Sequence, residues 1–241
     1  QFIISLAKKG FKVNLSELCE EERIMCLMLH YDIWQHPGGF QSLEESIRAI
    51  GKNKFLTEEI IEILEILIDR IDFFETNIKL EYAQPLKLHS RYTREQILAA
   101  LGFSTFQKKS SNREGVAESK ELKTELLFID LFKSEKDFSP STLYQDYAIS
   151  ETLFHWQTQN ATSAANGKGL SYINHQILGK TILLFVREKN IDEYNNTMSY
   201  VFLGDGKIID FYGSKPISIK WELSEPMPPY LWRDSAKMAI G

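Results

Sequence analysis

The feature that most constrains the fold of this chain is a change of hydrophobic period near residue 90. Before it, apolar residues recur every three to four positions, which is typical of amphipathic helices. After it, short apolar runs bounded by turn residues are typical of strands. The charge changes at the same place, because residues 1–90 hold 10 basic and 15 acidic side chains, whereas residues 91–241 hold 18 of each. We therefore expect an acidic helical domain over 1–90 and a β-rich domain over 91–241.

Glycine and proline separate three predicted helices in the first domain, which run over residues 16–35, 42–51 and 57–74. Ser42 followed by Glu45 has the spacing of a capping box, and Thr57 is the predicted N-cap of the third helix. Because an acidic bundle is a poor surface for DNA, we interpret this domain as a connector or docking domain.

The second domain is predicted to open with a short helix over 94–101 capped by Thr93, and to contain a mobile loop over 160–169. Gly204-Asp205-Gly206 is predicted to join two strands as a tight hairpin. Mostly antiparallel short strands predict a closed or half-closed barrel, so the expected fold class is α+β, a helical bundle followed by a β-barrel-like domain. The predicted strands cover residues 122–132, 171–174, 181–188, 199–203, 207–212 and 217–223.

Signatures of catalysis and metal binding are weak. Glu118-Ser119-Lys120 and Glu121-Leu122-Lys123 match half of a metal-nuclease motif, but the nearest upstream aspartate is Asp72, in the helical domain. Cys19 and Cys26 lie seven residues apart in one predicted helix and do not have zinc-ligand spacing. We therefore expect no catalytic residues, no metal and no cofactor.

The location in the cell follows from what the chain lacks. No apolar run reaches the roughly 18 residues that span a bilayer, and no signal-peptide pattern is present. Two cysteines that are not expected to pair fit a reducing compartment. We therefore expect a cytoplasmic protein without a membrane partner. Because the sequence begins at Gln1, we expect it to be part of a longer chain.

The segment over residues 133–160 mixes aromatic rings with amides, hydroxyls and charges. Aromatic faces stack on flat ligands while polar groups read their edges, so this mixture suits a nucleic-acid base. The alternative is a dense internal polar network around core rings. The candidate base-binding residues are Trp156, Tyr144 and Tyr147 as stacking rings, and Asp137, Gln157, Asn160 and His155 at the base edge.

Binding to a duplex also needs cations for the phosphates, although the second domain is neutral overall. The candidate cations lie in or near predicted loops and could equally form a solvated surface of mixed charge. They are Lys133, Lys136, Arg113, Arg187 and Lys168.

Seven ordered blocks in the second domain resemble a bacterial C-terminal domain long labelled as of unknown function. The blocks are Tyr92 to Leu98, Arg113 to Val116, Lys133 to Pro140, Tyr144 to Ser150, Leu153 to Gln157, Tyr172 to His175 and Leu183 to Glu188. That domain follows a phospholipase-D-like nuclease and a superfamily 2 helicase in type IV, modification-dependent restriction enzymes.

The resemblance implies a target-recognition role, finding 5-methylcytosine or a related base in foreign DNA during phage defence. Cleavage and ATP hydrolysis would then reside in nuclease and helicase domains of the same chain, with the acidic helical domain as the connector. Known methylcytosine readers that flip bases use curled sheets of the SRA or PUA kind, and the strand pattern is compatible with these by analogy.

Our hypothesis is thus a non-enzymatic module that binds double-stranded DNA containing modified cytosine by flipping the base into an aromatic pocket. One alternative is a protein-interaction module that regulates a helicase without reading bases. Another is a stand-alone metal nuclease.

Overall fold

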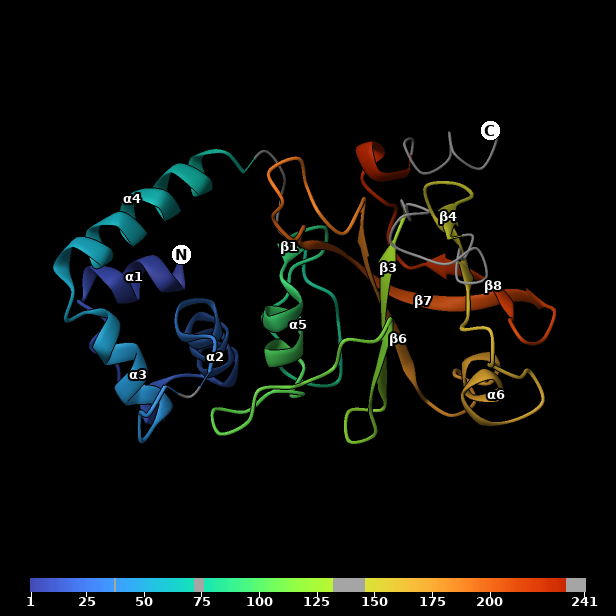
Figure 1. The fold of residues 1–241 in the computed structure, drawn as a ribbon, viewed down its shortest axis with the longest axis horizontal. Coiled ribbons are helices and arrows are strands. Elements are labelled where there is room, and N and C mark those ends of the chain that lie inside the picture. The colour runs from blue at the N-terminus through green and yellow to red at the C-terminus, as the bar shows by residue number, and fades with distance from the viewer. Residues whose placement is uncertain (37, 72–75, 132–145, 233–241) are drawn as a thin grey trace. The chain divides into compact units, whose positions relative to one another are not determined.

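The computed structural model describes residues 1–36, 38–71, 76–131 and 146–232, and the chain divides into two compact units (Figure 1). The first unit comprises residues 1–87 and 93–111, and the second comprises residues 88–92 and 112–241. The helix that follows Thr93 therefore belongs with the N-terminal helices. Among the described residues, no helix is both long enough and apolar enough to cross a membrane.

The first unit is helical, and its core lies between the first, second and third α-helices. Phe11, Cys26, Ile47 and Ile50 are fully buried there. The helices are α1 (Phe2–Lys8), α2 (Glu20–Trp34), α3 (Leu43–Ile50), α4 (Lys54–Asp69) and α5 (Arg94–Ala100), with a 3-10 turn over Leu15–Glu17.

The helix ends follow side-chain capping. The predicted helix after Thr93 is confirmed as α5, where Thr93 and Gln96 form a capping box. Ser42 caps α3 by accepting from the backbone N–H of Glu45, but the Glu45 carboxylate accepts from the backbone of Gln41, so only half of the predicted box forms. The prediction of Thr57 as the N-cap of α4 is wrong. The N-cap is Asn53, four residues earlier, whose side chain accepts from the backbone N–H of Leu56.

The second unit is built on one eight-stranded sheet, in which β3 and β6 are parallel and the other pairs are antiparallel. Its main order is β2-β3-β6-β7-β8-β5-β4, and β1 pairs with β7. The sheet is open, so the α+β class is confirmed and the closed barrel is not. The strands are β1 (Arg91–Tyr92), β2 (Val116–Ser119), β3 (Thr124–Asp130), β4 (Tyr147–Ala148), β5 (Leu153–Gln157), β6 (Thr181–Arg187), β7 (Tyr200–Tyr212) and β8 (Ser218–Leu223).

The predicted hairpin at Gly204-Asp205-Gly206 is wrong, because these residues lie inside the 13-residue strand β7. The first half of β7 pairs with β6 and the second half pairs with β8. Gly206 permits close packing here, since a Cβ at this position would lie 2.8 Å from Cδ1 of Leu184. The glycines therefore mark a close approach within a strand instead of a turn.

The predicted strand over 171–174 is also wrong, because this segment belongs to helix α6 (Gly167–Ile173), which begins inside the predicted loop. Tyr172 of α6 is buried in the main core of the second unit, against Trp156. Phe185, Phe202 and Trp221 are fully buried, as their strand positions predict. Phe211, which strand position also assigns to the core, is 43% exposed near the end of β7.

Close packing of α6 yields a stability prediction. A Cβ on Gly169 would lie 2.1 Å from the carbonyl oxygen of Ser163 and 2.6 Å from Cδ1 of Ile217. Gly169→Ala should therefore destabilise the protein by about 1–3 kcal/mol, although alanine normally favours a helix. Urea denaturation measures this. Gly115→Ala is the control, because its nearest contact is an ordinary 3.6 Å, and equal stability of the two variants would contradict the packing argument.

Candidate nucleic-acid interface

One face of the sheet carries a row of polar and aromatic side chains across β4, β5, β8 and β7. Tyr147 pairs with His155, His155 pairs with Lys220, and Lys220 pairs with Asp210. Side chains alternate along a strand, so the residues directly before and after His155 and Lys220 point to the opposite face. That opposite face is the main hydrophobic core, which contains Phe154, Trp156, Ile219 and Trp221.

Three rings gather on this face. Tyr147 stacks on His155, with ring centroids 4.7 Å apart and planes inclined by 20°. Tyr212, from the end of β7, lies on the other side of His155 with centroids 6.3 Å apart, and its hydroxyl is 3.5 Å from His155 Nε2. Tyr212 is 57% exposed and Tyr147 is half-buried, so aromatic surface is open to solvent here. We call Tyr147, His155 and Tyr212 the aromatic row.

Charged groups lie beside the aromatic row. The Lys220 ammonium donates to Asp210 Oδ2 at 3.0 Å, and this hydrogen bond lowers the pKa of Asp210 and raises the pKa of Lys220. Both tyrosines of the row also raise the pKa of Lys220. Next to Tyr147, the buried carboxylate of Asp146 accepts from the backbone N–H of Gln157 at 2.9 Å. Planar rings, a cation and hydrogen-bonding groups are thus presented together.

The structure brings some of the predicted base-binding residues together. Tyr147 and Gln157 are half-buried in this region, and Asn160 is exposed three residues beyond the end of β5. His155 lies between the two tyrosines but is only 2% exposed, so the prediction that it reads a base edge does not fit this structure. Trp156 is only 5% exposed and packs against Tyr172 and Trp221. Its ring therefore has no open face for a base in this structure. Tyr144 and Asp137 lie outside the described residues.

Of the predicted phosphate-binding residues, one is buried, two are exposed and two lie outside the described residues. The guanidinium of Arg187 donates to both carboxylate oxygens of Asp130, at 2.6 and 3.1 Å, and lies over the ring of Tyr200. Because Arg187 is buried, these contacts make it part of the interior. Lys168 and Arg113 are exposed. Lys133 and Lys136 lie outside the described residues.

Two residues of this face, Tyr212 and Lys220, were not predicted as site residues. Each stands in a run that reads as an ordinary strand, and only cross-strand pairing brings them to His155. The alternation in β8, with Ile219 and Trp221 buried on either side of Lys220, was the one available signal.

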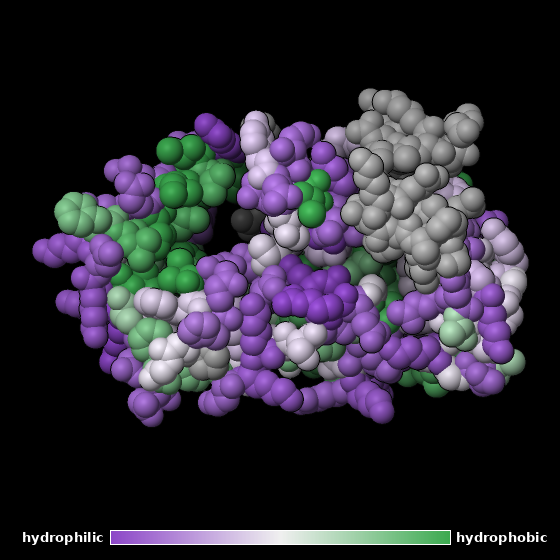
Figure 2. Space-filling view, in the orientation of Figure 1, coloured by the Kyte–Doolittle hydropathy of each residue, from purple (hydrophilic) through white to green (hydrophobic). Residues whose placement is uncertain are grey.

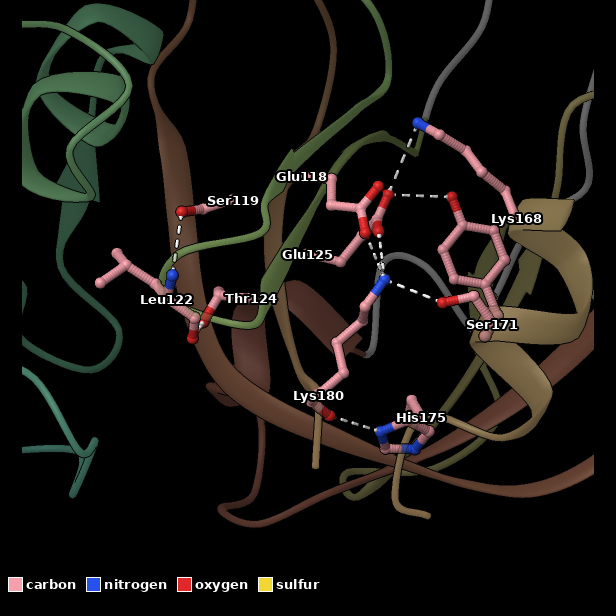
Figure 3. Close-up of polar contacts among 10 residues, drawn as sticks. Glu118, Ser119, Leu122, Thr124, Glu125, Lys168, Ser171, His175 and Lys180 are labelled. Atoms are coloured by element: carbon pink, nitrogen blue, oxygen red, sulfur yellow. Dashed lines mark hydrogen bonds and ion pairs between the residues drawn. The ribbon is translucent and has the colours of Figure 1, made fainter. Parts of the chain in front are cut away.

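A second polar cluster lies under α6 and is built around the ammonium of Lys180 (Figure 3). Lys180 Nζ donates to Glu118 at 2.6 Å, Glu125 at 3.3 Å and Ser171 Oγ at 2.8 Å. The hydroxyl of Tyr172 donates to Glu125 at 3.2 Å, and Lys168 lies 3.8 Å from the same carboxylate. Burial raises the pKa of Glu125, whereas the hydrogen bond from Lys180 lowers the pKa of Glu118.

Two acids and a lysine are also the chemical groups of many metal nucleases, so this cluster bears on the nuclease alternative. Here Glu118 and Glu125 face each other across β2 and β3, and the Lys180 ammonium bonds to both carboxylates. Glu125 is 1% exposed. Over the described part of the chain, no group of three His, Cys, Asp or Glu side chains could hold a metal ion. The arrangement is that of an internal ion network that fastens α6 to the sheet.

His175 completes the attachment of α6. Its Nε2 accepts from the backbone N–H of Ile208 at 3.2 Å, so its Nδ1 carries the proton and donates to the carbonyl of Lys180 at 3.0 Å. Burial lowers the pKa of His175, which keeps the ring neutral. The segment that carries α6 is therefore tied to β3, to the residue before β6, and to β7.

The fold and this face define an α+β protein whose open, mostly antiparallel sheet presents an aromatic and charged surface. The chain belongs to the family described as "Domain of unknown function (DUF3427)", which matches residues 86–235. No curated protein matches the chain. Among solved structures, Arabidopsis thaliana SUVH6 in complex with SAM is similar at 14% identity and a TM-score of 0.39, over 92% of this chain and 40% of that one. That likeness is too weak to support a conclusion about function.

Removing the central cation of the Lys180 cluster should be strongly destabilising. Lys180→Met leaves the buried carboxylate of Glu125 without its main counter-ion, and breaking a buried pair in this way costs about 3–5 kcal/mol. Urea denaturation would measure the loss. Lys189→Met is the matched control, because its ion pair with Glu193 is exposed and should contribute little. A similar midpoint for both variants would show that the cluster is not structural.

Stability should fall on mild acidification. Burial lowers the pKa of His30, His89 and His175 from 6.5 in the folded state. As the pH falls below about 6.5, the unfolded chain takes up protons at these histidines first, so their contribution is full above that pH and is lost toward their folded-state pKa values. Asp32, whose pKa burial raises to about 6, opposes this loss, but one group does not reverse the effect of three. Thermal unfolding at about pH 7.5 and pH 5.5 would measure this, and a midpoint that stays level or rises at the lower pH would contradict it.

Proposed function

We propose that this chain is the target-recognition module of a modification-dependent restriction enzyme and reads 5-methylcytosine in double-stranded DNA. The flipped base would lie against the aromatic row. The nuclease and helicase activities would belong to other domains of the same chain, and the module would act in the cytoplasm. The family match over residues 86–235 supports the resemblance from which this proposal starts.

The single observation that carries the proposal is the aromatic row itself. Flipping a base costs a few kcal/mol, and stacking on one ring returns about 1–3 kcal/mol. Tyr212 is 57% exposed and Tyr147 is half-buried, so these two rings are open to an extruded base, whereas His155 between them is 2% exposed and supports them from within. Two stacking contacts with added hydrogen bonds are sufficient to offset the cost.

Groups that could read the base edge lie next to the rings. A carboxylate or an amide oxygen accepts from the exocyclic amino group of cytosine. Asp146 directly precedes Tyr147, and its buried carboxylate accepts from the backbone N–H of Gln157, whose half-buried side chain lies two residues beyond His155 on β5. A 5-methyl group adds only about 0.8 kcal/mol by simple burial, so strong selectivity requires a close apolar wall. The predicted base readers Asp137 and Tyr144 remain part of the proposal, as predictions outside the described residues.

Two exposed lysines that could contact the DNA backbone, Lys168 and Lys215, lie on or next to two loops that contact each other. The loop that precedes α6 is hydrogen-bonded to the β7–β8 turn, because Lys215 N donates to Thr162 O at 3.0 Å and Ala164 N donates to Ser214 Oγ at 3.1 Å. This pair of loops carries exposed Asn160 and Lys215, and exposed Lys168 follows in the first turn of α6. Phosphate contacts from these lysines would make binding weaken as salt rises.

Fluorescence anisotropy with matched duplexes, with and without 5-methylcytosine, tests the proposal at two salt concentrations. We expect tighter binding to the methylated duplex, and Tyr212→Ala should weaken it about 5–150-fold, the equivalent of one lost stack. Tyr194→Ala is the control, because Tyr194 is an exposed tyrosine on the β6–β7 connection, away from the aromatic row.

Equal, salt-sensitive binding to both duplexes would leave a general DNA-binding module. Absence of binding to either duplex would favour the protein-interaction alternative. Magnesium-dependent cleavage by this chain alone would favour the nuclease alternative.

A further inference from the structure

Helix α4 of the first unit has an apolar face that this unit does not cover. None of the 16 residues of α4 is buried. Five large apolar side chains on it or just beyond it are exposed, and Figure 2 shows hydrophobic surface gathered where α4 lies. These residues are Phe55 at 81% exposure and Ile63, Ile66, Leu67 and Ile71 at 45–53%. We call them the outer face of α4.

The outer face is not needed to hold α4 in place, because other side chains do so. Leu56, Ile60 and Ile61 pack against the core of the first unit. Lys8 of α1 also forms an ion pair with Glu65 at 2.6 Å. One apolar side of α4 therefore packs against the core of the first unit, and the outer face is a second apolar surface on the same helix.

The spacing of the outer face fits a helical partner. Ile63, Ile66 and Leu67 stand at positions i, i+3 and i+4, so they form one ridge along the helix. Phe55 lies two turns before Ile63 with the exposed Glu59 between them, and Ile71 lies beyond the end of α4, so the continuous apolar ridge is the segment from Ile63 to Leu67. A short exposed ridge with i, i+3 and i+4 spacing is a surface against which another amphipathic helix can pack.

The charges beside the ridge define the partner further. Residues 54–69 contain five acids and one base, Lys54. Glu58, Glu59 and Glu62 are exposed next to the apolar ridge. A second copy of α4 would bring acidic flanks against acidic flanks, which is repulsive. A partner with basic flanks would be attracted.

We propose that the outer face of α4 docks a basic amphipathic helix from another domain or protein. The interaction is independent of DNA reading, since it involves only the first unit. It assigns the acidic helical unit a specific role as a docking module with an apolar ridge and an acidic border.

The test uses the full 241-residue chain and a fluorescent designed peptide, a helix of about 16 residues with leucines along one face and lysines on both flanks. We expect saturable micromolar binding by anisotropy. The triple variant Ile63→Gln, Ile66→Gln and Leu67→Gln should weaken it at least about tenfold, because the ridge is lost. All three side chains are exposed, so the variant should keep its circular dichroism spectrum.

Matched controls separate docking from general attraction between opposite charges. Ile177→Gln with Leu178→Gln removes two exposed apolar side chains from the second unit and should leave peptide binding within about twofold. A peptide with glutamates in place of lysines should bind at least about tenfold more weakly, as should a scrambled peptide of the same composition.

Three outcomes would overturn the proposal. The first is unchanged binding of the lysine peptide by the triple variant, and the second is equal binding of the scrambled or glutamate peptide. The third is a dimer of the wild-type chain in sedimentation velocity that the triple variant does not form, because a second copy would then cover this face.

Discussion

The second unit depends on the pairing of one long strand with two different sets of neighbours. The first half of β7 forms a ladder with β6 and the second half forms a ladder with β8. Through these pairings the parallel β3–β6 pair and the antiparallel β8-β5-β4 set become one sheet with a common core. The aromatic row exists only because this strand continues to Tyr212, where it reaches the level of Gln157 and His155.

The elements that local sequence determines could be predicted from the sequence. The cap at Thr93, the strand over 181–188 and the burial of Phe185 and Trp221 follow from local pattern. Gly204-Asp205-Gly206 has turn chemistry, yet the residues stay in a strand because tertiary pairing on both sides outweighs local propensity. Tyr172 has good strand propensity but lies in a helix, because its side chain fills the core under α6.

The candidate site shows the same division. The stacking of Tyr147 on His155 agrees with the aromatic–polar character of the segment that contains them. Trp156 points to the core face of β5. Because neighbouring side chains in a strand point to opposite faces, placing His155 on the outer face would have predicted this. Arg187 looks like a phosphate contact in sequence, but Asp130 is its parallel-strand partner, and the sequence does not reveal that pairing. Sequence indicates which residues are chemically unusual, whereas register determines which of them meet.

The short strand β1 has a mechanical consequence. Residues 88–92 belong to the second unit, while the residues before and after them belong to the first, so the chain passes between the units three times. Arg91 and Tyr92 of this segment pair with Val201 and Tyr200 at the start of β7, and Arg91 is further held by Glu188. If the chain is pulled at residues 88–92, the force acts on the hydrogen bonds between β1 and β7 and is passed to β7, the strand that ends at Tyr212. The connection to the helical unit is therefore paired with one end of β7, and the face proposed to hold the base lies at the other end of the same strand.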